Sequence, residues 1–428
     1  MKVLWIVNIL MPDLALEYGL KETVGGGWLV GLYTDLSKIA NVELVICCPT
    51  DKKELNNEGS RIRETQYYFF ERNVKPCLNE KTTNRFEEII RIENPDIIHI
   101  WGTEYAHSLQ AYYASEKLRM NERVVVSIQG LVSVYARHYY AGLSEKIVNS
   151  RTLLECIKRD NLRNRHDDFV KRGRFEAELI KKTNYVIGRT DWDKACTSQI
   201  NDTVTYFHCN ETLRPSFYIS KWEYDKCEKH SIFFTQCSVP LKGFHILLDA
   251  MPLIKKDFPD AKIYITGNLI GINSTCSLKD RLKERTYDKY LSEKIRELGL
   301  SDSIVFLGPL DEIKMKEMYQ KCNVFVLASS IENSPNSLGE AMILGTPCVA
   351  AHVGGVTSMI KQDEEGYVFD VNAPYMLAYY VCQVFKNKER ISEMTEKARK
   401  HAQRTHNREE NSNRIMQIYE EMIEQRGE

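Results

Sequence analysis

The sequence lacks any apolar run of the roughly 18 residues that a transmembrane helix needs. It also lacks a Cys-x-x-Cys pair, so its 12 cysteines predict neither a zinc knuckle nor a thioredoxin-like site. We expect buried free thiols in a reducing compartment instead of disulfides. The apolar run within residues 1–8 is short and no small-residue cleavage site follows it, which favours a buried first strand over a signal peptide. These absences predict a cytoplasmic protein.

An excess of charge of one sign is missing as well. The 58 Lys and Arg residues are balanced by 59 Asp and Glu residues, so the net charge is -1. This balance gives no general argument for nucleic-acid binding, and we expect no nucleic-acid partner. At 428 residues, with 43% apolar and 27% charged residues, the chain is typical of a globular protein with two domains.

Short apolar runs alternate with longer amphipathic stretches, which predicts an α/β fold with parallel sheets covered by helices. The expected strands are 3–8, 43–48, 96–101, 123–128, 185–188 and 204–207, followed by 231–237, 261–266, 303–306, 324–327 and 347–350. We expect two doubly wound, Rossmann-like domains facing across a cleft. Their predicted ranges are 1–212 and 213–405, and a helix over 406–428 is expected to pack back on the first domain.

Ligands of open α/β sheets bind beyond the carboxyl ends of the strands, so the segment after strand 324–327 is a candidate site. There, Asn336 or Ser337 is a predicted N-cap of a helix that Gly345 ends. The N-terminus of such a helix attracts an anion such as phosphate. Glu332 precedes the helix and Glu340 lies inside it, and ionised carboxylates can accept hydrogen bonds from sugar hydroxyls. The alternative is a pair of solvated surface glutamates.

Lys242-Gly243 follows strand 231–237, where a lysine ammonium can neutralise a phosphate. The alternative is an ordinary lysine in the first turn of a helix. Gly354-Gly355 follows strand 347–350 and allows close backbone approach to a ligand, although a plain turn would also explain it.

Three glycines, Gly25-Gly26-Gly27, stand between the first strand and a predicted helix. Backbone N–H groups of such a loop can approach a phosphate or a sugar. A flexible loop is the alternative interpretation.

The segment from Glu332 to Met342 reads E-x-x-P-N-S-x-x-E-A-M and is followed by Gly345-Thr346-Pro347. Together with the glycine loop, Lys242-Gly243 and Gly354-Gly355, in this chain order, it resembles the group 1 glycosyltransferases, the retaining family 4, which have the GT-B fold. The resemblance covers essentially the whole chain and is strongest over residues 231–370.

The resemblance implies a role for each matching residue. Glu340 would bind the ribose hydroxyls of a nucleotide, Glu332 the donor sugar and Lys242 the diphosphate. Glu332 and Lys242 would form the catalytic set. The implied donor-binding residues are Glu340, Asn336, Ser337, Leu338, Gly26, Gly27, Gly354 and Gly355. The donor is expected to be a nucleoside-diphosphate sugar, UDP-linked, used without a cofactor or a metal ion, because no Asp-x-Asp cluster stands out at a strand end.

Three positions depart from the family pattern. Cys237 stands where many members have an arginine, and Ser358 stands where a glutamate is common. Gln129 replaces a histidine near the reacting centre of many members, and an amide cannot act as a general base.

Acceptor-side residues are expected after strand 96–101, where Glu104 and His107 could meet acceptor hydroxyls, and at Gln129. For Glu104, capping of the following helix is the alternative. The expected acceptor is a glycan, a lipid-linked molecule or a small molecule.

Residues 145–174 contain nine Lys or Arg against five Asp or Glu, and Tyr135, Tyr139 and Tyr140 precede them. One interpretation is a membrane-facing patch, with the protein at the inner face of the membrane. The other is a solvated helix face.

The expected reaction is sugar transfer with retention, by front-face attack assisted by the leaving phosphate, in polysaccharide or glycoconjugate biosynthesis. A non-catalytic, nucleotide-sugar-binding subunit and a nucleotide-sugar epimerase on the same fold remain as alternatives.

Overall fold

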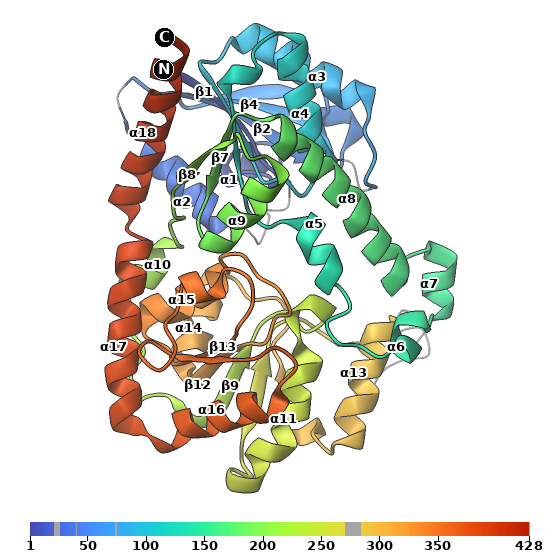
Figure 1. Ribbon diagram of the computed structural model, residues 1–428, viewed down its shortest axis with the longest axis vertical. Helices are drawn as coiled ribbons and strands as arrows, with labels where there is room; N and C mark the ends of the chain where they lie inside the picture. Colours follow the sequence, from blue (N-terminus) through green and yellow to red (C-terminus); the bar gives the residue numbers. More distant parts are fainter. Residues whose placement is uncertain (21–25, 40, 73–74, 270–283, 428) are drawn as a thin grey trace. The chain divides into compact units, whose positions relative to one another are not determined.

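The computed structural model in Figure 1 describes residues 1–20, 26–39, 41–72, 75–269 and 284–427. It divides into two compact units. Unit 1 consists of residues 1–134, 168–214 and 405–428, and unit 2 consists of residues 135–167 and 215–404. Each unit is a sheet with helices on both faces, which confirms the predicted α/β class.

The sheet of unit 1 has the strand order β3-β4-β2-β1-β5-β6-β7-β8, and all neighbours are parallel except β3 and β4. Its strands are β1 Lys2–Ile6, β2 Glu43–Thr50, β3 Gly59–Ile62, β4 Thr65–Glu71, β5 Ile97–Trp101, β6 Val124–Ser127, β7 Tyr185–Gly188 and β8 Thr205–His208. The six strands predicted for this half are confirmed. The sequence analysis missed β3 and β4, an antiparallel pair at the sheet edge, because β3 has no apolar run.

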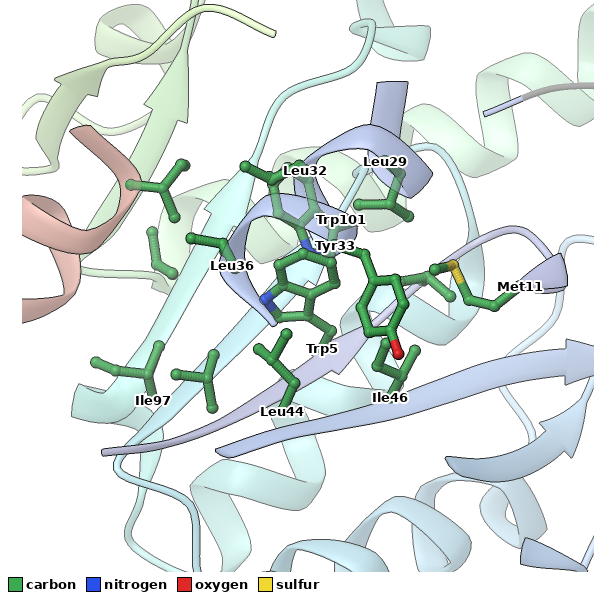
Figure 2. Packing of buried hydrophobic residues seen from close by; sticks show 14 of the residues in the cluster. Trp5, Met11, Leu29, Leu32, Tyr33, Leu36, Leu44, Ile46, Ile97 and Trp101 are labelled. Carbon is green, nitrogen blue, oxygen red and sulfur yellow. The ribbon is translucent and has the colours of Figure 1, made fainter. Parts of the chain in front are cut away.

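Two apolar layers enclose this sheet. One face packs against α1 Pro12–Glu17, α2 Gly27–Leu36 and α18 Arg408–Gly427, and the other against α3 Glu80–Glu93, α4 Ala106–Lys117 and α8 Leu162–Lys182. Figure 2 shows the first layer, in which Leu29, Leu32 and Leu36 of α2 lie over Trp5 and Trp101 of the sheet. The rings of Trp5 and Trp101 meet edge to face at 5.2 Å, a favourable arrangement of aromatic pairs.

The C-terminal helix α18 belongs to unit 1 and packs on it, as predicted. Its Tyr419 hydroxyl accepts the indole N–H of Trp5 at 3.1 Å and lies 2.6 Å from Nδ1 of His99. All three side chains are buried, so the polar groups of this contact satisfy one another inside the core.

The sheet of unit 2 has the order β11-β10-β9-β12-β13-β14 and is parallel throughout. Its strands are β9 Glu228–Phe234, β10 Lys262–Ile265, β11 Ile304–Phe306, β12 Cys322–Leu327, β13 Cys348–Ala351 and β14 Tyr367–Phe369. The five predicted strands are confirmed, and β14, which has only three residues, was missed. The helices of this unit include α10 Pro215–Tyr218, α11 Phe244–Asp257, α13 Thr286–Glu297, α14 Glu312–Lys321, α15 Asn336–Leu344, α16 Pro374–Lys386 and α17 Lys388–Thr405.

Both sheets reverse their strand order at one point. In unit 2 the neighbours β9 and β12 begin the two halves of the sheet, and in unit 1 the neighbours β1 and β5 do so. The loops that leave such a pair run to opposite faces and open a crevice at the carboxyl ends, where ligands of this fold class bind. A predicted site residue is therefore expected to lie in a loop that follows one of these strands.

One predicted boundary is wrong. Residues 135–167 were expected in the first domain, but they belong to unit 2. The Ser330 hydroxyl donates to the carbonyl of His138 at 3.2 Å, and the ring Nε2 of His245 lies 2.8 Å from the carbonyl of Ala141. These contacts join parts of the chain more than 100 residues apart, which a local sequence pattern does not reveal.

All cysteines within the described residues are free thiols, and most of them are buried, as expected. In the same part of the chain, no helix combines the length and the apolar composition needed to cross a bilayer.

Candidate active site

The reversal point of unit 2 brings Lys242 and Glu332 into direct contact. Lys242 ends the 3-10 turn Pro240–Lys242 after β9, and Glu332 lies in the loop after β12. The Lys242 ammonium is 2.5 Å from Oε1 of Glu332, which also accepts the Ser329 hydroxyl at 2.7 Å. Glu332 is buried and Lys242 is partly exposed. The two residues of the expected catalytic set are thus an ion pair at the carboxyl edge of the sheet.

A glycine makes this approach of the two loops possible. Gly243 has a φ of +73°, and a Cβ atom there would lie 1.9 Å from the carbonyl oxygen of Ala328. The amide of Ser330 donates to the carbonyl of Leu241 at 2.8 Å. Any larger side chain at Gly243 would push the loops apart, so this glycine determines the distance between Lys242 and Glu332.

The second glycine pair supports Glu332 from its backbone. Gly354 has a φ of +50°, and a Cβ atom there would lie 2.0 Å from the Glu332 carbonyl oxygen. The amide of Gly355 donates to that same oxygen at 3.0 Å. Gly354 and Gly355 therefore position the Glu332 loop, a role that sequence reasoning did not assign to them.

The helix α15 begins at Asn336, with Pro335 as its N-cap. The prediction of Asn336 or Ser337 as the N-cap is wrong, because the Pro335 carbonyl already accepts the amides of Leu338 at 2.9 Å and Gly339 at 3.3 Å. Gly345 ends the helix with a φ of +79°, as predicted. The start of α15 carries the positive end of the helix dipole, which favours an anion.

Glu340 lies in the second turn of α15 and is only 6% exposed. Because Glu332 is also buried, neither glutamate is the solvated surface residue that the alternative interpretation required. Both lie in the segment that follows β12, at the carboxyl edge where ligands of open α/β sheets bind.

The departures from the family pattern leave less positive charge at this edge. Cys237 is fully buried, and burial raises the pKa of its thiol, so this side chain is neutral. Ser358 is exposed, and its amide donates to the Gly355 carbonyl at 3.0 Å. Lys242 and the α15 N-terminus are thus the sources of positive potential that the described loops bring to this site.

In unit 1 the glycines after β1 are required by packing. Gly26, with a φ of +82°, is the N-cap of α2, and a Cβ atom there would lie 2.4 Å from Cδ1 of Ile9. A Cβ atom at Gly27 would lie 2.7 Å from Cγ of Arg214. The predicted helix after the loop is confirmed, whereas Gly25 lies outside the described residues.

Glu104 follows β5 at the reversal point of unit 1, and burial raises the pKa of its carboxyl to about 7. Its Oε2 is buried and has no hydrogen-bond partner among the described residues. The capping alternative is wrong, because α4 has Tyr105 as its N-cap and no side chain caps it. An orphaned buried carboxylate oxygen at a strand end is a feature of functional sites.

His107 does not face the solvent as an acceptor site would require. Its ring packs against Phe70 at 4.9 Å and stacks on Tyr105 at 5.4 Å, and it is 6% exposed. Burial, with smaller contributions from Arg72 and Arg172, lowers its pKa to about 3. The prediction of His107 as an acceptor-side residue is corrected to a packing role in the first turn of α4.

Gln129 takes part in a buried polar network that the sequence analysis missed. Its amide donates to Glu211 at 2.7 Å, and Glu211 is paired with Arg189 at 2.6 Å. Arg189 in turn donates to the Gln129 carbonyl at 2.9 Å. These groups line a cavity of about 20 Å³ beneath Trp28, which is room for about one water molecule. Arg189 directly follows β7, and this position at a strand end is the feature of the sequence that could have identified it as a candidate site residue.

One Asp-x-Asp cluster does follow a strand, contrary to our expectation. Asp191-Trp192-Asp193 comes after β7 and begins α9 Asp191–Ile200. Asp193 forms a capping box with Thr190 and accepts the amide of Arg189 at 2.9 Å and the Tyr206 hydroxyl at 2.5 Å. This carboxylate serves the helix start.

Comparison with known proteins bears mainly on unit 2. Residues 221–401 match the family "Glycosyl transferases group 1". A D-inositol 3-phosphate glycosyltransferase from Corynebacterium urealyticum is 29% identical over 179 residues, which are 42% of this chain and 40% of that protein. N-acetyl-alpha-D-glucosaminyl L-malate synthase from Bacillus anthracis is 30% identical over 24% of this chain and 27% of its own length. The chain matches less than half the length of these relatives.

Solved structures resemble the whole chain at low identity. Sucrose-phosphate synthase from Thermosynechococcus elongatus has a TM-score of 0.67 at 14% identity, covering 99% of both chains. Anabaena HepE in complex with UDP and glucose has a TM-score of 0.68 at 15% identity, covering 98% of this chain and 100% of that one. The chain has the GT-B fold of these structures, and its residues 221–401 match the group 1 glycosyl transferase family.

Proposed function

We propose that this protein transfers a sugar from a nucleoside-diphosphate sugar to an acceptor hydroxyl, with retention of the anomeric configuration. The observation that carries the proposal is the Lys242–Glu332 pair at the reversal point of unit 2, beside the loop that leads to the N-terminus of α15. The match of residues 221–401 to the group 1 family supports it. The donor is proposed to be UDP-linked, as in the HepE complex.

Each group has a proposed part in donor binding. The N-terminus of α15, with Asn336, Ser337 and Leu338, is proposed to receive the diphosphate, and Lys242 to neutralise it. The buried Glu340 accepts hydrogen bonds from the ribose hydroxyls, and Glu332 accepts them from the donor sugar. Gly26 and Gly27 are proposed donor-binding residues as well.

The proposed reaction needs no protein nucleophile. The bond from the anomeric carbon to the diphosphate oxygen breaks while the acceptor oxygen bonds to the same face of that carbon, and the acceptor proton passes to the leaving phosphate. Negative charge grows on the diphosphate, where Lys242 and the helix dipole stabilise it. Gln129 cannot take the proton of the acceptor hydroxyl, which fits a mechanism in which the leaving phosphate is the base. Glu104 and Gln129 are proposed to orient the acceptor.

The proposed setting is the synthesis of polysaccharides or glycoconjugates, without a metal ion. A thermal-shift screen of UDP, GDP and ADP sugars tests the donor site, because a ligand that binds only the folded state raises the melting temperature. Product analysis with the best donor then tests the reaction. Transfer or slow donor hydrolysis with retained configuration is expected. An epimerised donor would indicate an epimerase, and binding without any turnover would indicate a non-catalytic subunit.

A further inference from the structure

The short helix α7, Leu153–Lys158, turns its polar side toward the protein and its apolar side outward. Glu155 is buried, whereas Leu153 is 73% and Ile157 76% exposed. Residues four apart share one face of a helix, so these two aliphatic side chains form a single exposed stripe. Surface helices normally have the opposite orientation.

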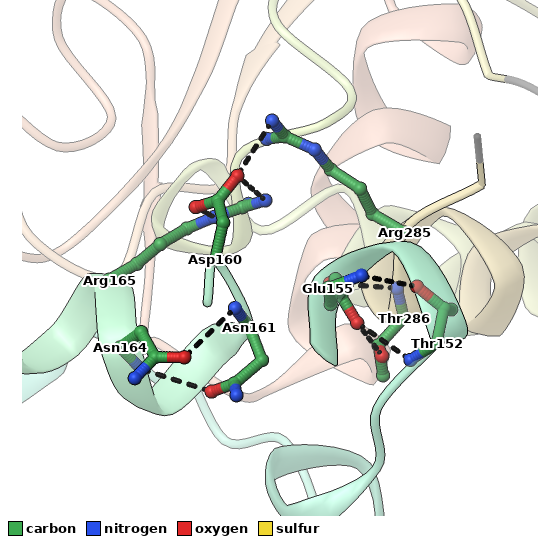
Figure 3. Close-up of polar contacts among 8 residues, drawn as sticks. All are labelled: Thr152, Glu155, Asp160, Asn161, Asn164, Arg165, Arg285 and Thr286. Carbon is green, nitrogen blue, oxygen red and sulfur yellow. Dashed lines mark hydrogen bonds and ion pairs between the residues drawn. The ribbon is translucent and has the colours of Figure 1, made fainter. Parts of the chain in front are cut away.

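A buried polar contact holds α7 in this orientation, as Figure 3 shows. Thr152 and Glu155 form a capping box at the start of the helix. Glu155 also accepts the backbone amide of Thr286, the first residue of α13, at 3.1 Å, and the Thr286 hydroxyl donates to its other oxygen. A helix of six residues is not stable alone, and the apolar stripe of α7 adds little to its stability because it faces outward. The hydrogen bonds to α13 therefore stabilise α7 in this orientation.

Asp160, two residues after the end of α7, is also held by polar contacts. Asp160 is 2.8 Å from Nε of Arg165 and 3.0 Å from Nη2 of Arg285. Asn161 and Asn164 exchange hydrogen bonds between their amides and side chains beside it. Two acidic residues of this segment, Glu155 and Asp160, are therefore occupied by partners within unit 2.

Most basic side chains of residues 145–167 are exposed to solvent. Lys146, Arg151, Lys158, Arg159 and Arg163 are exposed, and none of them forms an ion pair with another residue of the described ranges. Glu145 and Asp167 are the exposed acidic residues of this segment. The segment that carries Leu153 and Ile157 thus exposes more positive than negative charge.

We infer that the outer face of α7 docks on a bilayer rich in anionic lipids, with Leu153 and Ile157 entering the headgroup region and the surrounding cations meeting lipid phosphates. Exposed aliphatic residues ringed by Lys and Arg have the chemistry of such a surface, whereas the cores of protein interfaces are depleted of Lys. Tyr139 is buried and Tyr140 stacks on His166 at 4.9 Å, so we place the contact at α7 and not at these two tyrosines.

Flotation of the full chain with phosphatidylcholine vesicles, with and without phosphatidylglycerol, tests the inference. Binding is expected only with phosphatidylglycerol and should fall as NaCl is raised. Replacement L153S/I157S should weaken the partition about tenfold or more, and K158Q/R159Q should weaken it about 25-fold. The matched control is Ile219→Ser, since Ile219 is 85% exposed elsewhere in unit 2.

Absence of binding to the anionic vesicles would overturn the inference, as would equal binding by L153S/I157S with an unchanged melting curve. Self-association of the wild type without lipid, lost in L153S/I157S by gel filtration, would also overturn it, because a second copy would then cover this face. The measurement needs no donor, so its outcome is independent of the proposed sugar transfer.

Discussion

Lys242 and Glu332 stand 90 residues apart in the chain, yet Nζ of the lysine lies 2.5 Å from Oε1 of the glutamate. Each loop follows one of the two strands at which the sheet of unit 2 reverses its order. The two charges neutralise each other, so a diphosphate that binds Lys242 must compete with a carboxylate already in place. In the proposed donor site, the charge of Lys242 is therefore already compensated by Glu332 before a ligand binds.

Replacement of Lys242 by Met should weaken the binding of UDP-glucose about 10- to 100-fold, because a charge-assisted contact contributes about 1.5–3 kcal/mol. It should also lower the melting temperature, since Glu332 would remain buried with the Ser329 hydroxyl but without its cation. Calorimetric titration and thermal melting measure the two effects. The control is Lys256→Met, at an exposed lysine of α11. An unchanged dissociation constant would refute the role of Lys242.

Replacement of Glu340 by Ala should reduce the affinity for the nucleotide part of the donor by about 2–3 kcal/mol, because a buried charged partner of the ribose is lost. Titration with UDP alone isolates this part of the ligand. Glu389→Ala, at an exposed glutamate of α17, serves as the comparison. Equal UDP affinity in the two variants would exclude Glu340 from the nucleotide site.

Gly354→Ala should disturb the site through the backbone of Glu332. The added Cβ atom would lie 2.0 Å from the Glu332 carbonyl oxygen, and the residue has a φ of +50°. Gly299→Ala is the matched control, because Gly299 has a φ of +63° and nothing within 4 Å of the added atom. The control should cost about 1–2 kcal/mol of stability and leave donor affinity unchanged. Gly354→Ala should cost more and weaken donor binding, and equal effects of both changes would contradict this role.

Glu104 should make the stability of the protein depend on pH. Its folded pKa of about 7 lies above the ordinary glutamate value of 4.5, so the folded state binds the proton more tightly than the unfolded state does. The free energy of unfolding should therefore fall by about 3 kcal/mol as the pH rises from below 4.5 to above 7. Glu104→Gln cannot ionise and should be more stable than the wild type at pH 8 but similar near pH 4. Denaturant unfolding at both pH values measures the difference, with Glu17→Gln at an exposed position as the control.

Addition of EDTA should leave turnover unchanged. Lys242 and the N-terminus of α15 are proposed to supply the positive potential for the leaving diphosphate, and Asp193 of the Asp-x-Asp cluster is bound to the start of α9. Initial rates with and without EDTA, and after addition of Mg²⁺, measure the effect. Complete loss of activity that Mg²⁺ restores would show that the diphosphate needs a metal ion.

Much of the fold could be predicted from local pattern. Runs such as 97–101 and 322–327 are apolar and buried on both faces, as parallel strands covered by helices must be, so their signal survives without any tertiary information. A strand at the edge of a sheet need not be apolar and buried on both faces. The four residues of β3 alternate between exposed and partly buried, so the sequence of β3 resembles a loop, and β14 is too short to show a pattern.

Sequence order also located the two glutamates, the lysine and the glycines of unit 2, because loops after strands of a doubly wound sheet converge at one edge. It could not assign what each residue touches. That Gly354 supports Glu332, that Gln129 is bound to Glu211 and that His107 packs against Phe70 depend on contacts between distant segments.

The sequence by itself therefore determined the class of fold and the positions of the site residues along the chain, since both follow from periodicity and from spacing within a few turns. Tertiary structure alone decided that Lys242 faces Glu332, that Oε2 of Glu104 is buried without a partner among the described residues, and that residues 135–167 join unit 2 and turn Leu153 and Ile157 outward. The reason is physical, because burial and charge pairing depend on which distant segments meet, and a local pattern carries no record of that.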